Sequence, residues 1–204
     1  MTKHREPEEA SSVDLYWLPL GAGETTGLVR RSGRLFESVV AGLERREPRD
    51  IYHSALEVRL DGDRFVIEMT PVWGNGPGDH GVVAQGAVGL PQLGRSRYFR
   101  YEIRRWHSGS IPDAVEAVDS PVRLSDASGP ARRLLSLVPS FPTLTWGRDE
   151  LDTGDMWNSN SLVSWLLARS GHDTDLVHPP PRGRAPGWKA GLVVAGRHSD
   201  RPTC

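Results

Sequence analysis

The residues whose types could do chemistry in this chain are a serine and a histidine that lie far apart. Ser159 belongs to the run Asn-Ser-Asn-Ser at 158–161, and His53 belongs to the strand-like run Tyr-His-Ser-Ala-Leu-Glu-Val at 52–58. A serine hydroxyl is a weak nucleophile until a base accepts its proton and a third group orients that base. At a helix start, backbone N–H groups and the helix dipole could stabilise an oxyanion. The two residues are therefore a candidate pair for acyl-group chemistry.

A predicted β-hairpin supplies the third member. Residues 51–60 and 63–70 have strand patterns, and Asp61-Gly62 between them is typical of a two-residue type I′ turn. This turn pairs residues whose numbers sum to 123, so Val58 faces Phe65. On the other face of the hairpin His53 would face Thr70, and Glu68 would lie diagonally next to His53. The hairpin thus predicts His53 as the base and Glu68 as the group that orients it.

A helix beginning near Asp155 and ending at Gly171 would position the serine. Ser159 shares a helical stripe with the apolar residues three, four, seven and eight positions later, so its hydroxyl would point into the protein. Asn158 and Asn160 could bind an oxyanion, and Trp157 could contact substrate. The same residues also fit a purely structural interpretation, with Ser159 as a capping or core hydroxyl and His53 as a hydrogen-bonded strand residue.

These motifs resemble the circularly permuted papain-like group, a branch of the NlpC/P60 superfamily in which histidine precedes the nucleophile. YiiX-like, PPPDE and lecithin:retinol acyltransferase proteins are examples. His53 matches the base of that group, Glu68 its polar third residue, and Asn158-Ser159-Asn160 its Asn-Cys-Asn run, and the likeness covers about residues 50–70 and 150–170. The resemblance implies a permuted papain-like α+β fold and a hydrolase or acyltransferase that acts on an amide, ester or thioester.

Serine stands here where the group carries cysteine, and a thiolate is far easier to generate than an alkoxide. Three interpretations follow: a serine enzyme, an inactive relative that binds a peptide or acyl ligand, or a chain altered to trap its substrate. A further alternative is a structural partner protein whose surface, rich in Trp and Arg, forms the interface. The sequence does not separate them, and it does not define the substrate or the oligomeric state.

Composition excludes several classes. With 25 Lys and Arg against 26 Asp and Glu, the net charge of −1 gives no reason to expect nucleic acid as a partner. Cys204 is the only cysteine, and the histidines have no metal-ligand spacing, so no metal or other cofactor is predicted. No apolar run is long enough to span a membrane, and a cytoplasmic location is expected.

The remaining patterns predict one α+β domain at 12–197, in which an antiparallel sheet packs against helices, between a disordered leader at 1–11 and a flexible tail at 198–204. Strands are expected at 13–20, 82–88, 97–106 and 190–195, and helices at 26–46 and at 130–138, the latter capped by Ser128. A group of arginines between the middle strands could bind anions, although their alternation favours a solvated strand face: Arg95, Arg97, Arg100, Arg104 and Arg105.

Overall fold

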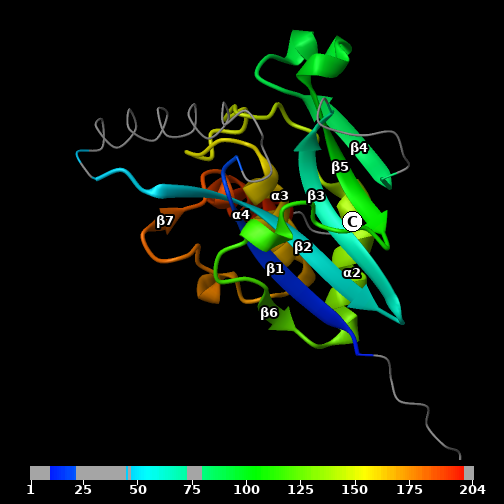
Figure 1. Cartoon of the computed structure of the whole chain (residues 1–204). Coiled ribbons are helices and arrows are strands. Elements are labelled where there is room, and N and C mark those ends of the chain that lie inside the picture. The colour runs from blue at the N-terminus through cyan, green and yellow to red at the C-terminus, as the bar shows by residue number, and fades with distance from the viewer. Residues whose placement is uncertain (1–9, 22–44, 46, 73–79, 200–204) are drawn as a thin grey trace, which may run out of the picture.

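A computed structural model of the chain describes residues 10–21, 45, 47–72 and 80–199, and its centre is a mainly antiparallel sheet (Figure 1). Six strands lie in the order β4-β5-β3-β2-β1-β6, and a short strand, β7, pairs in parallel with the start of β2. The bounds of the strands are β1 Ser12–Pro19, β2 Asp50–Leu60, β3 Asp63–Pro71, β4 Val82–Ala87, β5 Arg100–His107, β6 Val122–Ser125 and β7 Gly183–Arg184. The predicted α+β class with an antiparallel sheet is confirmed.

The β2–β3 hairpin has the predicted turn and register. Asp61 and Gly62 have φ angles of 52° and 85°, the left-handed conformation that a type I′ turn requires at both positions. Leu56 pairs with Ile67 and Val58 with Phe65, as expected. This register determines which side chains of β2 and β3 lie on each face of the sheet.

In the described part of the chain, three helices lie on one side of the sheet: α2 Ser128–Leu137, α3 Ser159–Ser170 and α4 Trp188–Ser199 (Figure 1). The main core lies between them and the sheet. It receives Leu56 and Val58 from β2, Ile67 from β3, and Leu162 and Leu166 from α3. The strand residues of this core are two positions apart, as expected when alternate side chains point to the same face.

The opposite face carries a second, smaller apolar cluster. It contains Leu18 from β1, Ala55 from β2, Val66 from β3 and Ile111 from the segment that follows β5. The cluster is small because charged side chains occupy much of this face. One of them is Arg104, which is only 4% exposed.

Some predicted elements differ from those observed. The run 190–195, predicted as a strand, lies in α4, and Gly191 packs so closely against α3 that a Cβ would overlap the Ser164 hydroxyl. A short apolar run is compatible with a strand or with a buried helix, and here the close packing against α3 favours the helix. Helix α3 begins at residue 159 and not near 155, and α2 begins at Ser128, after Ala127 as the N-cap. The predicted helix at 26–46 falls almost entirely outside the described residues.

Candidate functional site

The first turn of α3 is held by a capping box. The Asn158 side-chain oxygen accepts hydrogen bonds from the backbone N–H groups of Asn160 (2.9 Å) and Ser161 (3.4 Å). In return, the Ser161 hydroxyl accepts the N–H of Asn158 at 3.1 Å. These bonds satisfy N–H groups that have no partner inside the helix. Two of the four polar residues at 158–161 are thus used to start the helix.

Asn160 joins α3 to β2 and to the loop before α4. Its amide nitrogen donates to the carbonyl oxygens of Tyr52 (2.9 Å) and Pro186 (2.8 Å), and its Oδ1 accepts the hydroxyl of Ser54 at 2.8 Å. Asn158 also donates to the Pro186 oxygen, at 2.8 Å. Asn160 and Ser54 are each only 1% exposed, so this connection is buried. A carboxamide suits the position because it donates and accepts at once.

Two serines continue this connection along α3. The Ser161 hydroxyl donates to the carbonyl of Gly187 and the Ser164 hydroxyl to that of Trp188, both at 2.8 Å. Gly187 has a φ of 91°, and a Cβ there would overlap the Asn158 side chain, so glycine is required. These bonds form one polar unit, which we call the α3 joint and which consists of Asn158, Asn160, Ser161, Ser164, Ser54 of β2 and residues 186–188.

Ser159 is the exception within the run. It is the first residue of the helix and 3% exposed, yet its hydroxyl makes no hydrogen bond to any residue that the structure describes. The predicted burial is confirmed, but burial does not distinguish this serine, because Ser161 is also buried. Helix α3 is buried on nearly all sides. Trp157, the predicted substrate contact, stacks on Phe141 with ring centroids 4.8 Å apart and donates to the carbonyl of Pro142.

His53 lies on the other face of the sheet from α3. Its neighbours Tyr52 and Ser54 provide the groups that bind Asn160, whereas His53 pairs with Leu18, a member of the second apolar cluster. The imidazole is half-buried, and burial lowers its pKa to about 4. Among the described residues, no hydrogen bond joins it to Ser159. The predicted Ser159–His53 contact is therefore not formed, because successive strand residues point to opposite faces.

Glu68 has a different partner from the one predicted. Paired residues of β2 and β3 run only from Leu56–Ile67 to the turn, and Glu68 pairs instead with Arg104 of β5. Its carboxylate accepts the Arg104 guanidinium at 2.9 Å, and Arg104 also binds Glu102 at 3.0 Å. Burial raises the pKa of Glu68, and the contact with Arg104 opposes this shift. The geometry thus places Glu68 in an ion-pair cluster with Arg104 and not behind the His53 imidazole.

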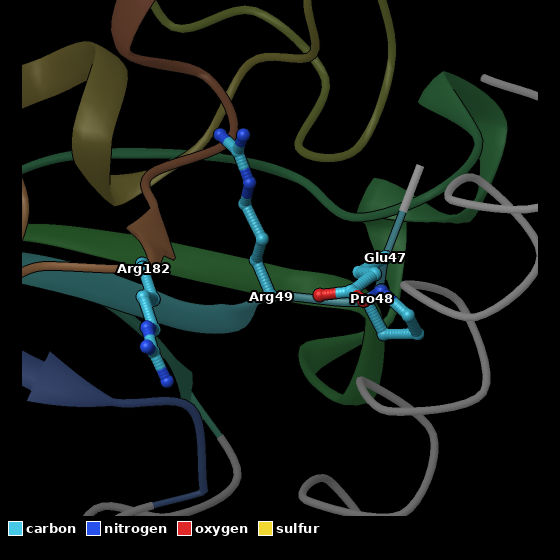
Figure 2. A pocket seen from close by; sticks show the side chains of 5 residues that line it. Glu47, Pro48, Arg49 and Arg182 are labelled. Carbon is cyan, nitrogen blue, oxygen red and sulfur yellow. The ribbon is translucent and has the colours of Figure 1, made fainter. Parts of the chain in front are cut away.

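A cavity of about 660 Å³, which no sequence pattern predicted, lies at the start of β2 and is lined by Glu47, Pro48, Arg49, Arg182 and Gly183 (Figure 2). It lies next to the α3 joint, because Gly183 packs against the ring of Tyr52. Figure 2 shows the guanidinium groups of Arg49 and Arg182 extending in opposite directions, so they do not converge on one anion. The lining presents both signs of charge to different parts of the cavity.

Comparisons with known proteins add no family to this geometry. No family model, curated protein or solved structure matches the chain. Among the described residues, no group of three or more His, Cys, Asp or Glu side chains could hold a metal ion. No helix in the described ranges is long and apolar enough to cross a membrane. The candidate site therefore consists of the α3 joint, the unbonded Ser159 hydroxyl and the neighbouring cavity.

Proposed function

We propose that this chain is a non-catalytic ligand-binding domain related to the permuted papain-like proteins, and that its ligand is a peptide. The observation that carries the proposal is the state of Ser159. Its hydroxyl occupies the position of a nucleophile at a helix start, but no described base is hydrogen-bonded to it. A serine without such a base has little nucleophilicity near neutral pH.

His53 could not replace that base efficiently even if it approached Ser159. Its pKa of about 4 lies far below neutral pH, and a general base works best when its pKa is near the working pH. Glu68 cannot raise that basicity from where it lies, because its carboxylate binds Arg104. Both features favour binding over acyl transfer.

The cavity beside the α3 joint supports a peptide as the ligand. Its volume of about 660 Å³ is in the range of small-molecule sites. Arg182 lines the cavity and offers a positive charge for a carboxylate, which a short peptide carries at its C-terminal end.

Labelling with a fluorophosphonate probe tests the absence of catalysis. We expect no labelling of the wild-type chain, and equal results for Ser159→Ala. A Ser159→Cys variant in a Cys204→Ser background provides a sharper test with iodoacetamide. If no base acts on position 159, the pH profile of alkylation will be the same with His53 intact and with His53→Gln. Wild-type labelling that is lost in both Ser159→Ala and His53→Gln would establish an enzyme instead.

Saturation-transfer NMR tests peptide binding separately. The probe is a mixture of random tetrapeptides with free termini, compared with the same mixture acetylated and amidated. We expect signal transfer only to the free peptides, and a loss of that transfer in Arg182→Ala but not in Arg148→Ala, an exposed arginine outside the cavity. Equal transfer to both mixtures, or none, would contradict a peptide site with charged ends.

A further inference from the structure

The connection between β4 and β5 exposes apolar and basic side chains together. Residues 88–99, which we call the β4–β5 lobe, contain two 3-10 helices, η2 Pro91–Arg95 and η3 Arg97–Phe99. The lobe projects beyond the end of the sheet (Figure 1). Neither short helix has a buried residue. A tight hairpin would have joined the two strands with fewer residues, so the projection is an added feature of the fold.

Large apolar side chains gather on this lobe. Of the eight large hydrophobic residues exposed in the described part of the chain, four lie within ten consecutive positions: Leu90, Leu93, Tyr98 and Phe99. Tyr98 is 64% exposed. Single exposed apolar residues are common on protein surfaces, but four on one short segment favour an interaction site.

The charged residues of the lobe are both arginines, so the lobe is positively charged. No Asp or Glu occurs between Asp79 and Glu102, whereas Arg95 and Arg97 are both exposed. Neither arginine forms an ion pair with a residue that the structure describes, although the Arg97 guanidinium lies 5.9 Å from the centroid of the Tyr98 ring. This local charge contrasts with the net charge of −1 of the whole chain.

Backbone hydrogen bonds anchor the base of the lobe. The N–H of Val88 donates to the carbonyl of Phe99 at 2.8 Å, which closes the base of the lobe. The N–H of Gly89 donates to the carbonyl of Trp146 at 3.0 Å, which ties the base to the body of the protein. These bonds anchor the base of the lobe, so its exposed side chains are presented from a backbone that is fixed at both ends.

We propose that the β4–β5 lobe docks on the surface of an anionic phospholipid bilayer. Its leucines and aromatic rings would enter the interfacial region while Arg95 and Arg97 bind the headgroups. A nucleic acid fits less well, because bases stack on aromatic rings but not on Leu90 or Leu93. A symmetric contact between two copies would bring the unpaired arginines of both lobes together, which is unfavourable.

Co-sedimentation of the full chain with vesicles tests this proposal. The probes are vesicles of phosphatidylcholine alone and of phosphatidylcholine with phosphatidylglycerol. Two arginines near an anionic surface predict about 30-fold stronger partitioning into the mixed vesicles at low salt. The double variant Arg95→Gln/Arg97→Gln should lose this preference, whereas Leu93→Ser/Tyr98→Ser should weaken binding about tenfold or more.

Matched variants elsewhere on the surface serve as controls. Val115→Ser/Leu176→Ser changes two residues that are even more exposed, and Arg133→Gln/Arg148→Gln removes two exposed arginines. Both should bind mixed vesicles as the wild type does. Equal loss in control and lobe variants would overturn the proposal, as would failure of the wild type to sediment with mixed vesicles. In the second case, lobe-dependent binding of an oligonucleotide or lobe-dependent dimerisation would identify the true partner.

Discussion

Substitution Asn160→Ala measures how much the α3 joint contributes to folding. The change removes three hydrogen bonds, to Ser54, Tyr52 and Pro186. The Pro186 carbonyl keeps its bond from Asn158, so two buried groups lose a partner, the Ser54 hydroxyl and the Tyr52 carbonyl. Each unsatisfied buried group costs about 1–3 kcal/mol. We expect the free energy of unfolding to fall by about 3 kcal/mol.

Urea denaturation followed by circular dichroism gives this free energy. Ser159→Ala is the matched control, because it removes a buried hydroxyl at the adjacent position. That hydroxyl has no hydrogen bond among the described residues, so its removal leaves no group without a partner, and the control should keep or slightly raise the free energy of unfolding. Asn160→Asp retains the side-chain volume and removes the two amide donor bonds. It should therefore destabilise the chain as well, which separates lost hydrogen bonds from lost packing.

A double-mutant cycle decides whether the loss arises at the predicted contact. In Ser54→Ala/Asn160→Ala the unsatisfied Ser54 hydroxyl is absent, so the double variant should be more stable than the sum of the single effects by about 1 kcal/mol. Additive effects would refute the argument. So would an Asn160→Ala variant as stable as Ser159→Ala, because the joint would then be no more important than an unbonded hydroxyl.

Three other predictions concern the two faces of the sheet and the α3 joint. The pKa of His53 is about 6.5 in the unfolded chain and about 4 in the folded one. The free energy of unfolding should therefore be highest above pH 6.5 and fall by up to about 3 kcal/mol as the pH is lowered to 4. His53→Gln should remove this pH dependence in urea titrations. Arg104→Ala removes the buried guanidinium that binds Glu68 and Glu102 and should cost about 3 kcal/mol, whereas Arg132→Ala, at the exposed pair with Asp61, should cost less than about 0.5 kcal/mol by the same measurement. Gly187→Ala should lower the melting temperature sharply, because its Cβ would overlap the side chain that caps α3, whereas Gly129→Ala in α2, with open space around it, should raise it slightly.

Short sequence patterns were sufficient to predict the β2–β3 hairpin, but they did not predict the surroundings of Ser159 correctly. Asp61-Gly62 determines the turn by its own backbone preferences, and the turn then determines the pairs from Leu56–Ile67 onward. The pairing of Ser159 with His53 depended instead on which sheet face the helix would cover. Leu56 and Val58 make one face strongly apolar, and helices pack on that face. His53 has the opposite parity along the strand, which already disfavoured contact with α3.

The position of Arg104 shows a second limit. Its alternation with apolar neighbours suggested a solvated face, but its burial follows from the pairing of β5 with β3, which places it opposite Glu68. The number of residues between these strands gives no information about that register. Pairs formed between distant strands are set by the whole sheet, and a short sequence pattern cannot specify them.

Burial of α3 explains the Asn-Ser-Asn-Ser run without catalysis. A helix that starts inside a protein has N–H groups that water cannot reach, and each must find a partner. Asn158 and Ser161 satisfy these groups, and Asn160 binds carbonyls of the segments that enclose the helix. Three of the four polar residues are therefore required by where the helix begins. Ser159 alone has no such role, so any function beyond folding at this site must use its hydroxyl or the cavity beside the joint.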